Sequence, residues 1–535
     1  MSNPRGNAQT AATLDEYAAL LELAGAGPWS ARAYRRAARL IRELPVPVDD
    51  LVRGGRVREL RGIGPGIEAR LAELVETGRI AELEELKQST SPELVALGRM
   101  LGFGPRLATA IGETLGVRSA EQLETAARAG RLRDVPGIGP RTEAKIVAAL
   151  DAAPRAARNA LTLERAQAET EAIAEGLGGH PAGAARRWVD AIDRLAVVVA
   201  TTEPDDVRAR FAALPQIVTT LSPDEGLTRD GIPVDLVLAP PGALGTALVR
   251  ATGAPAYVAS LGPLPDAPDE AGVYRLLDRE PVPPELREPD APVPPSHLLG
   301  LDDIRGDLHC HTTWSDGRAT VREMAEAARA RGYAYLAICD HTTAVRVVPG
   351  LDADAVRRQR DEIAAANEQL APLRVLHGIE CDIRVDGSLD LPDDVLAELD
   401  WVQISLHAGQ RAPRRELTAR VVEAMHHPSA RCLSHPTGRL IGHRPENALD
   451  LERTIEASLR TGVALEVNGL PDRLDLSAEH ARTAIEAGVA LVCSTDAHSV
   501  AGLDRMSLSV HTARRAGAGR GNVLNTLPVD QLLAR

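Results

Sequence analysis

Asp307-Leu308-His309-Cys310-His311 is the stretch that decides the fold of the C-terminal part of this 535-residue chain. Its two histidines alternate with other residues, as they would on a β-strand that directs both imidazoles to one face. Further His, Asp and Glu residues recur downstream in short clusters: Ser315-Asp316-Gly317, Cys339-Asp340-His341, Gly378-Ile379-Glu380, Ser405-Leu406-His407, Ser434-His435-Pro436 and Ser494-Thr495-Asp496-Ala497-His498. This recurrence indicates one metal site assembled from many segments.

The histidine clusters each follow a short apolar run, and helix-like segments separate the runs. This pattern predicts βα units, whose strand ends would converge on one face of a barrel. A lone His-x-His motif is a weak signal for a metal. Here, however, twelve of the fourteen histidines follow residue 303, and six of these twelve occupy predicted strand ends beside carboxylates. We assign the other six to core, surface or supporting roles: His377, His426, His427, His443, His480 and His511.

Residues 303–535 resemble the polymerase-and-histidinol-phosphatase (PHP) family of metallo-phosphoesterases. All nine ligand positions of that family are matched here, by His309, His311, Asp316, His341, Glu380, His407, His435, Asp496 and His498. The resemblance implies a seven-stranded distorted β/α barrel that holds up to three divalent cations. Imidazole and carboxylate ligands without thiolate fit Mn²⁺ or Zn²⁺, with Fe²⁺ as an alternative.

Clustered divalent cations suit phosphoester hydrolysis. Two arginines that follow ligand clusters, Arg346 and Arg439, are predicted to hold the substrate phosphate, and Arg473 is a weaker third candidate. The alternative is that these arginines are surface charges. No separate general acid is assigned, because a metal ligand or a bound water could serve.

The bulk composition indicates several ordinary globular domains. A formal net charge of −14 argues against a surface built for unselective nucleic-acid binding, although it allows local basic patches. No apolar run reaches membrane-spanning length, and the beginning lacks a signal-peptide core. The five cysteines are odd in number and are predicted to be reduced and buried. We therefore expect a cytoplasmic, nucleoid-associated protein with no membrane partner.

Three glycine-rich turns occur in the first third, at Gly62-Ile63-Gly64-Pro65-Gly66, Gly102-Phe103-Gly104-Pro105 and Gly137-Ile138-Gly139-Pro140. Each would lead into a helix whose first amide groups could cradle a phosphate, although an ordinary turn between helices would look the same. Three copies resemble helix-hairpin-helix motifs, which implies contact with the DNA backbone without sequence specificity. The predicted DNA-binding residues are Gly62, Gly64, Gly66, Gly102, Gly104, Gly137, Gly139, Arg141 and Lys145.

Residues 28–38 resemble the opening of the lyase-like domain of family X DNA polymerases. In lyase-active members a lysine forms a Schiff base, and its position falls on Arg70 here. An arginine stays protonated and cannot act as that nucleophile, so lyase chemistry at this position is not expected.

The middle region departs from the same family. If Gly183-Ala184-Ala185-Arg186-Arg187 aligns with the nucleotide-binding signature, two of the three metal-binding aspartates fall at Arg194 and Ala196, and only Asp235 is retained. Polymerisation needs carboxylates that hold two cations about 3.5–4 Å apart. We therefore predict a polymerase core reduced to a scaffold.

The predicted fold class is multidomain, with an all-α helix-hairpin-helix N-terminal region, an α+β polymerase-like scaffold and a distorted (β/α)7 PHP barrel. The predicted parts are a lyase-like domain at 1–88, a fingers-like domain at 89–154, a degenerate palm and thumb at 155–278, a proline-rich linker at 279–302 and a PHP domain at 303–535.

The predicted function is metal-dependent DNA phosphodiester hydrolysis, as a 3′→5′ exonuclease in repair that also trims abasic or blocked 3′ ends. The alternatives are a small-molecule phosphatase of the histidinol-phosphate type, a non-catalytic DNA-binding scaffold and residual gap-filling synthesis.

Overall fold

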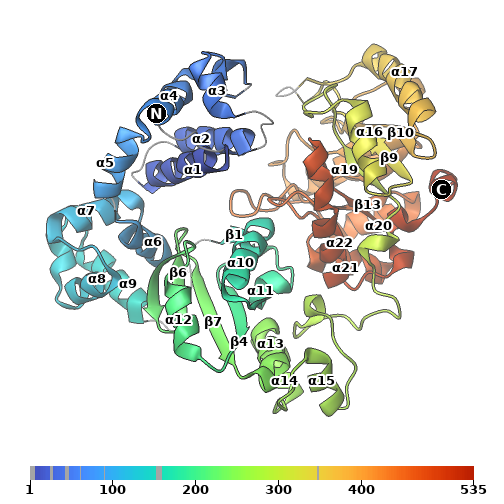
Figure 1. Cartoon of the computed structure of the whole chain (residues 1–535). Coiled ribbons are helices and arrows are strands. Elements are labelled where there is room, and N and C mark those ends of the chain that lie inside the picture. The colour runs from blue at the N-terminus through green and yellow to red at the C-terminus, as the bar shows by residue number, and fades with distance from the viewer. Residues whose placement is uncertain are drawn as a thin grey trace. The chain divides into compact units, whose positions relative to one another are not determined.

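The computed structural model describes residues 7–23, 28–42, 47–60, 62–89, 91–151, 160–345 and 349–535 (Figure 1). The chain divides into two compact units. The first comprises Met1–Ala160, Ala172–His180 and Asp193–Pro240, and the second comprises Leu161–Glu171, Pro181–Ile192 and Pro241–Arg535.

The N-terminal part of the first unit is all α-helical over the residues described. Its helices are α1 (Asn7–Leu23), α2 (Pro28–Arg42), α3 (Val48–Arg53), α4 (Pro65–Thr77), α5 (Ala81–Ser89), α6 (Pro92–Leu101), α7 (Pro105–Leu115), α8 (Ala120–Arg128) and α9 (Pro140–Asp151). Helices α4, α7 and α9 each begin with a proline directly after a glycine of a predicted hairpin. Proline suits the first helical position, because the N–H that it lacks would have no partner within the helix.

An α+β segment follows. Its strands are β1 (Leu161–Thr162), β2 (His180–Ala182), β3 (Ala191–Ile192), β4 (Leu195–Ala200), β5 (Ile217–Ser222), β6 (Glu225–Thr228) and β7 (Pro233–Ala239). Within the first unit the sheet order is β4-β7-β6-β5, with β4 and β7 parallel and the other pairs antiparallel. The helices are α10 (Leu163–Leu177), α11 (Gly183–Arg186), α12 (Pro204–Ala212), α13 (Leu244–Thr252), α14 (Pro255–Leu261) and α15 (Glu270–Leu276).

The second unit contains a parallel seven-stranded sheet in the order β14-β13-β12-β11-β10-β9-β8. Its strands are β8 (Gly306–Cys310), β9 (Tyr335–Ile338), β10 (Arg374–Asp382), β11 (Trp401–Ser405), β12 (Ala430–Leu433), β13 (Ala464–Asn468) and β14 (Leu491–Ser494). A parallel bridge between Cys310 and Ala497 brings the two edge strands together, so the barrel is nearly closed. The predicted fold class is confirmed.

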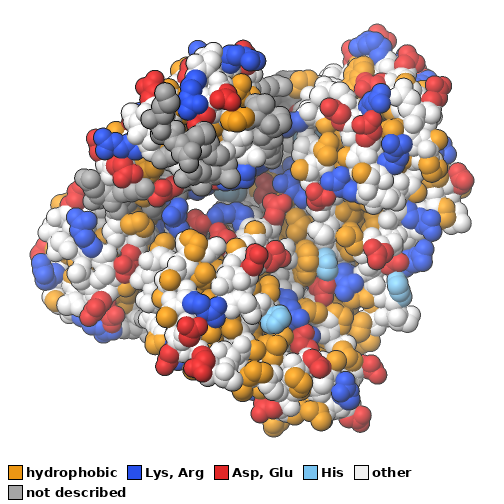
Figure 2. All heavy atoms as spheres, in the orientation of Figure 1, with side chains coloured by type: hydrophobic (Ala, Val, Ile, Leu, Met, Phe, Trp, Pro, Cys, Tyr) orange, Lys and Arg blue, Asp and Glu red, His pale blue; other side chains and the backbone are white. Residues whose placement is uncertain are grey.

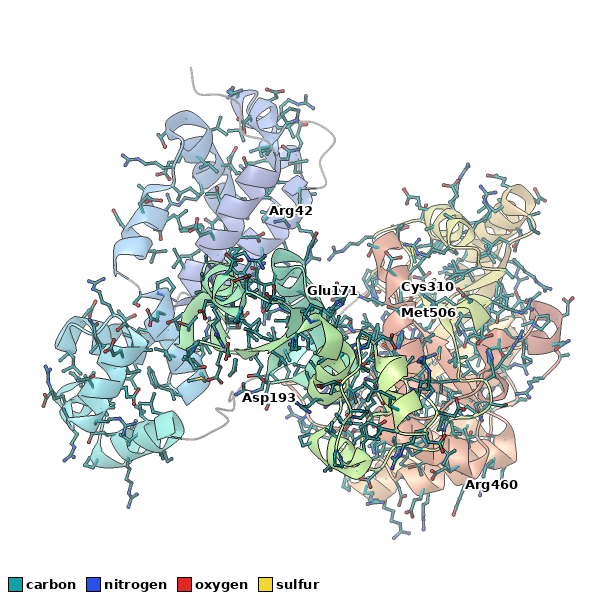
Figure 3. All side chains as sticks on the ribbon, turned by 60° about the horizontal axis from the view of Figure 1, so that its bottom comes forward. Arg42, Glu171, Asp193, Cys310, Arg460 and Met506 are labelled. Atoms are coloured by element: carbon teal, nitrogen blue, oxygen red, sulfur yellow. The ribbon has the colours of Figure 1, made fainter. Side chains whose placement is uncertain are left out.

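Helices cover the outside of the barrel, and they are α16 (Val321–Ala330), α17 (Ala353–Leu370), α18 (Asp393–Leu396), α19 (Arg414–Met425), α20 (Leu451–Thr461), α21 (Ala478–Ala487), α22 (Met506–Arg515) and α23 (Val529–Leu533). Helix α16 shows why they pack there, because it begins with a Thr320–Glu323 capping box and buries Val321 and Met324 on one stripe. Figure 3 labels Cys310 and Met506, which are buried in this unit, and Arg460, which is exposed on α20.

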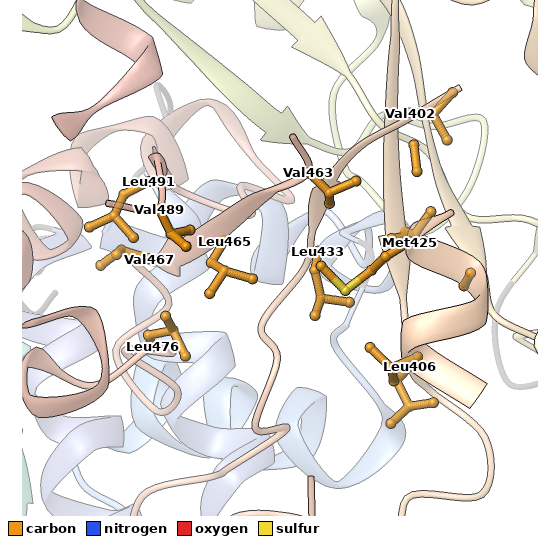
Figure 4. Close-up of a cluster of buried hydrophobic side chains, with 14 of the residues drawn as sticks. Val402, Leu406, Met425, Leu433, Val463, Leu465, Val467, Leu476, Val489 and Leu491 are labelled. Carbon is orange, nitrogen blue, oxygen red and sulfur yellow. The ribbon is translucent and has the colours of Figure 1, made fainter. Parts of the chain in front are cut away.

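Alternate side chains along a barrel strand face opposite sides, so that one set packs in the apolar core and the other faces the cluster of predicted ligands. On β13, Leu465 and Val467 join a large apolar cluster with side chains such as Leu433 and Leu491 (Figure 4). The alternate residue Glu466 is fully buried and directs its carboxylate to polar groups. Because successive strand residues face opposite sides, one strand builds both the core and the site.

The proline-rich segment predicted as a linker packs against the barrel. Glu285 is buried, and its carboxylate accepts hydrogen bonds from Nδ1 of His511 at 2.7 Å and Nε of Arg514 at 2.8 Å. Arg514 also donates to the carbonyl of Leu299 at 2.6 Å. These contacts anchor the segment to α22.

The face shown in Figure 2 carries interspersed acidic and basic side chains. All five cysteines are buried and free, as predicted. Over the described residues, the structure contains no helix long and apolar enough to cross a membrane.

Candidate metal centre

The nine predicted ligands lie at or just beyond the carboxyl ends of the barrel strands. His309 belongs to β8 and Glu380 to β10, and the others lie in the segments that follow strands: His311, Asp316, His341, His407, His435, Asp496 and His498. In the described residues, potential ligand atoms gather in three overlapping groups with atoms within 4.8 Å of one another: His311 with Asp316, His341 and His498; His309 with His311 and Asp496; and His341 with Glu380 and His407.

Glu380 lies at the centre of this cluster and is buried. Its carboxylate oxygens lie 2.9 Å from Nδ1 of His341 and 3.0 Å from Nε2 of His435. Nε2 of His407 is 3.5 Å away. One carboxylate therefore lies close to several imidazoles, and it could help to hold a cation together with them.

The donor set fits divalent cations. Nδ1 of His341 and Oε2 of Glu380 lie 2.9 Å apart, yet neither atom makes a hydrogen bond. Nδ1 atoms of His311 and His435 are also buried without a hydrogen-bond partner. Such atoms are costly to bury unless something else satisfies them, and a cation would do so.

The charges in the cluster support one another. Burial alone would raise the pKa of Glu380 and Asp496, but the surrounding imidazoles hold the pKa of both carboxyls well below the usual range. Burial, together with the neighbouring His498 and His341, lowers the pKa of His311 to about 4. His311 is therefore neutral at pH 7, the form in which an imidazole binds a metal.

Glu466 is a functional residue that the sequence analysis did not identify. Its Oε1 accepts hydrogen bonds from Nδ1 of His309 and Nε2 of Gln403, both at 2.7 Å. Its Oε2 accepts from the backbone N–H of His435 at 2.6 Å. Glu466 thus orients one ligand ring and fixes the backbone of another. The signal in the sequence was that two polar residues, Glu466 and Asn468, alternate with Val467 at the end of an otherwise apolar strand.

Two further buried carboxylates hold the ligand-bearing segments in place. Asp307 accepts a hydrogen bond from the backbone N–H of Thr495 at 3.3 Å, which joins β8 to the segment after β14. Asp340 accepts from Thr312 N–H at 2.7 Å and from Ser315 Oγ at 2.6 Å. These bonds shape the loop that presents the Asp316 ligand.

Of the two predicted phosphate-binding arginines, the structure describes Arg439 and gives its side chain other partners. Arg346 lies outside the described residues. Arg439 donates from Nε to the carbonyl of Arg473 at 2.7 Å and from Nη2 to Oδ2 of Asp190 at 2.6 Å. These bonds give Arg439 a structural role, and phosphate binding by either arginine stays a prediction.

The predicted DNA-binding glycines lie in the three hairpins. A Cβ atom added at Gly64, Gly104 or Gly139 would meet nothing within 4 Å, and none of the three has a positive φ. Neither packing nor backbone conformation therefore requires glycine there. Gly62, Gly102 and Gly137 adopt φ of 105°, 83° and 92°, which favours glycine. Gly66, Arg141 and Lys145 are exposed.

In the segment predicted as a polymerase palm, Asp235 lies beside Arg194 and Ala196, the two positions where the alignment loses an aspartate. Asp235 pairs in register with Ala196 across β4 and β7. The Arg194 guanidinium forms ion pairs with Asp235 and, at 3.1 Å, with Glu225. Burial raises the pKa of Asp235, and Arg194 opposes that rise. The positive charge of the Arg194 guanidinium therefore neutralises the carboxylate of Asp235, the aspartate that the alignment retains.

Arg70 lies on α4, and its guanidinium pairs with the Glu73 carboxylate at 3.2 Å and with Glu82. A hydrogen bond with Tyr17 raises the pKa of Arg70 still further. No amine nucleophile is therefore available at this position.

A parallel seven-stranded barrel with this His, Asp and Glu cluster at its carboxyl edge defines a PHP-type, metal-dependent phosphoesterase. Residues 307–469 match the PHP domain family. Residues 5–80 match the helix-hairpin-helix domain family, and residues 95–152 match the SAM-like helix-hairpin-helix tandem family.

Over 554 aligned residues, the chain is 32% identical to the DNA polymerase/3′-5′ exonuclease PolX of Bacillus subtilis (strain 168), covering 96% of each protein. The chain belongs to the PolX family. It is also 30% identical over 201 residues to a probable phosphatase of Acetivibrio thermocellus, covering 36% of this chain and 78% of that protein. A probable phosphatase of Thermoanaerobacter sp. (strain X514) is 27% identical over 235 residues, with 41% and 89% covered.

Proposed function

We propose that this protein is a metal-dependent DNA phosphodiesterase that removes nucleotides in the 3′→5′ direction and processes abasic or blocked 3′ ends in repair. The observation that carries this proposal is the convergence of eight ligand-type side chains, with His435 3.0 Å from Glu380, in a chain that also contains helix-hairpin-helix units. Membership of the PolX family supports the same activity.

Up to three divalent cations, Mn²⁺ or Zn²⁺ or alternatively Fe²⁺, would supply water activation and neutralise phosphate charge. The three groups of potential ligands described above would hold these cations. His435 belongs to none of the groups, but its Nε2 lies 3.0 Å from the carboxylate of Glu380, which does. The protein contributes rigid placement. Glu466 fixes His309, and Asp307 and Asp340 fix the loops on either side, so the ligands need little rearrangement.

DNA would be held by its backbone. At Gly64, Gly104 and Gly139 the absent Cβ leaves open space beside the start of a helix, which suits the close approach of a phosphate. Exposed Arg141 and Lys145 on α9 add positive charge. Such contacts carry no base information, so we expect binding without sequence preference.

We infer that DNA synthesis has been lost. Besides the Arg194 ion pair with Asp235, the two arginines of the nucleotide-binding signature have protein partners. Nη2 of Arg186 lies 2.6 Å from Oε2 of Glu270, and Nε of Arg187 lies 2.7 Å from Oε1 of Glu288. A triphosphate would have to displace both carboxylates.

The deciding experiment uses purified protein, Mn²⁺ and 3′-labelled single-stranded and gapped DNA, with and without dNTPs, beside histidinol phosphate. We expect nucleotide release and no primer extension. His341→Ala should abolish release and leave DNA binding intact, whereas His426→Ala, at an exposed histidine outside the cluster, should leave release unchanged. Primer extension that survives His341→Ala would contradict the loss of synthesis. Turnover of histidinol phosphate alone would favour the small-molecule phosphatase.

A further inference from the structure

A cavity of about 750 Å³ adjoins the metal centre. The ligand His407 forms part of its wall, and residues 409–412 and 443–448 form the rest. These are the segments that follow β11 and β12. The cavity therefore begins at a metal ligand and extends away from the cluster along two loops.

Among the charged side chains that line the cavity, the basic ones outnumber the acidic ones. Arg411, His443 and Arg444 are exposed and line it. Its one acidic residue, Glu446, has Oε1 3.6 Å from Nδ1 of His480 and so has a potential counter-charge of its own. The cavity thus presents net positive charge beside a phosphoesterase centre.

Positive charges lie close to Arg444 in the cavity wall. Burial lowers the pKa of Arg444, the charges of Arg473 and Arg411 lower it further, and the Asp475 carboxylate opposes them. A bound anion beside Arg411 and Arg444 would offset this positive charge further.

The loop that carries Arg444 is tied to the loop that carries Arg473. Ile441 N–H donates to the carbonyl of Asp472 at 2.7 Å, and Asn447 N–H donates to the carbonyl of Thr437 at 2.8 Å. Nε of Arg444 donates to the carbonyl of Gly438 at 2.9 Å, which fixes its guanidinium. The basic cavity is therefore preorganised.

We propose that this cavity binds phosphodiester groups of the DNA strand on the nucleotides next to the scissile bond, through Arg411 and Arg444. This inference rests on the proposed nuclease function. A single phosphate at the metal centre would not extend into the cavity, whereas a polynucleotide strand would. The cavity thus favours strands over small phosphate esters.

The test compares Arg411→Ala and Arg444→Ala with the parent protein and with Arg322→Ala, which removes an exposed arginine on α16 outside the cavity. With Mn²⁺ present, kcat/KM is measured for a single-stranded oligonucleotide and for the p-nitrophenyl ester of thymidine 5′-phosphate. We expect the ratio of kcat/KM for the oligonucleotide to kcat/KM for the small ester to fall about tenfold in each cavity variant. The fall should come from a higher KM for the oligonucleotide, and the ratio should stay constant in the control. Arg411→Glu, which reverses the charge, should lower this ratio further.

Oligonucleotide binding at several salt concentrations gives a second readout. Each cavity variant should reduce the slope of log affinity against log salt by about 0.7, the effect of one lost phosphate contact on single-stranded DNA. An unchanged ratio with an unchanged slope would overturn the inference, and so would an equal loss on both substrates. Absence of hydrolysis by the parent protein would instead contradict the proposed function, and the salt slopes would still test the cavity.

Discussion

Glu466 and His309 form a buried pair in which Nδ1 of the imidazole donates to a carboxylate oxygen at 2.7 Å. This bond fixes the ring so that Nε2 faces the ligand cluster, where Oε2 of Glu380 lies 3.5 Å away. A carboxylate behind a metal-binding histidine sets its tautomer and increases its basicity. The predicted metal centre therefore depends on a residue that is not itself among the nine predicted ligands.

Replacing this carboxylate by the isosteric amide in Glu466→Gln should weaken metal affinity about 10- to 100-fold. The amide carries no charge and would need to turn its oxygen toward His309. Titration of metal-free protein with Mn²⁺, followed by exonuclease rate, checks this, and excess Mn²⁺ should restore most of the rate. Glu368→Gln, at an exposed site on α17, is the control. Equal Mn²⁺ dependence in all three proteins would contradict the assignment.

The hairpin glycines provide a test of DNA binding that is separate from folding. Gly64→Ala, Gly104→Ala and Gly139→Ala should each unfold at the parent temperature, because the new methyl group meets nothing within 4 Å. Each should weaken DNA binding about tenfold by keeping a phosphate from one backbone donor, a loss of ~1.5 kcal/mol. Fluorescence anisotropy with labelled DNA measures the affinity.

Gly98→Ala is the contrasting variant, since its Cβ would lie 2.7 Å from the Phe103 ring and 3.0 Å from the Phe103 carbonyl oxygen. We expect it to lower the unfolding temperature. If the three hairpin variants bound DNA as tightly as the parent, the hairpins would not be the contact surface.

Asp235 tests the degenerate palm. In a working two-cation site its removal would abolish synthesis, but here its carboxylate is paired with Arg194. Asp235→Ala should therefore release nucleotides at the parent rate, and it should extend no primer, just as the parent extends none. Both are measured on gapped DNA with dNTPs and Mn²⁺, with His341→Ala as the variant that does lose release. Primer extension by the parent that disappears in Asp235→Ala would show a functioning palm.

The barrel and the grouping of its ligands could be predicted because their signal is local. Parallel strands bring their carboxyl ends to one edge, so His, Asp and Glu residues at strand ends had to converge there. Six of the nine predicted positions each enter one of the three groups, and His311 and His341 each enter two. His435, the ninth position, is in none of the groups, but its Nε2 lies 3.0 Å from Oε1 of Glu380. The ligand assignments themselves stay predictions.

The surroundings of the site could not be predicted in the same way, because they depend on distant pairings. Arg439 follows a ligand cluster just as a phosphate-binding arginine would, but Asp190, its partner in the structure, is 249 residues earlier. Glu466 lies on a strand without a ligand motif, and only the fold places it behind His309. Spacing identifies residues that share a strand end, whereas buried pairs require the tertiary structure.

Asp190 should matter for both stability and catalysis. Its carboxylate accepts hydrogen bonds from Arg439 at 2.6 Å and from Arg515 at 3.1 Å. Burial lowers the pKa of Arg515, so that guanidinium depends on its partner. Removing one partner of a buried pair costs ~3–5 kcal/mol, which is an upper estimate for these partly exposed arginines.

Asp190→Asn should therefore lower the unfolding temperature of the second unit. It should also reduce kcat for nucleotide release several-fold, because Arg439 holds the loop that begins at His435. Asp205→Asn removes a carboxylate from an exposed position and is the control. Calorimetry and exonuclease assays on all three proteins check both effects, and a fully stable, fully active Asp190→Asn would refute the argument.

The pH dependence of stability should depend in part on Glu285. Burial alone would raise the pKa of this carboxyl, but the hydrogen bond from His511 and the Arg514 guanidinium bring it down to about 2. A folded-state pKa below the unfolded value of about 4.3 means that the ionised form stabilises the fold. This contribution is fully present above about pH 4.3 and is lost as the pH falls toward 2. Its size is roughly 2–3 kcal/mol, from about two pKa units at 1.36 kcal/mol each.

Glu285→Gln should therefore lower the unfolding temperature at pH 7, and the gap from the parent should narrow as the pH falls from about 4.3 toward 2. Scanning calorimetry across this range measures the gap, with Glu368→Gln as the exposed control. His511→Gln, which removes one donor, should give a smaller gap at pH 7, because Nε of Arg514 still lies 2.8 Å from the Glu285 carboxylate. A gap between Glu285→Gln and the parent that stays constant with pH would mean that Glu285 contributes packing rather than charge.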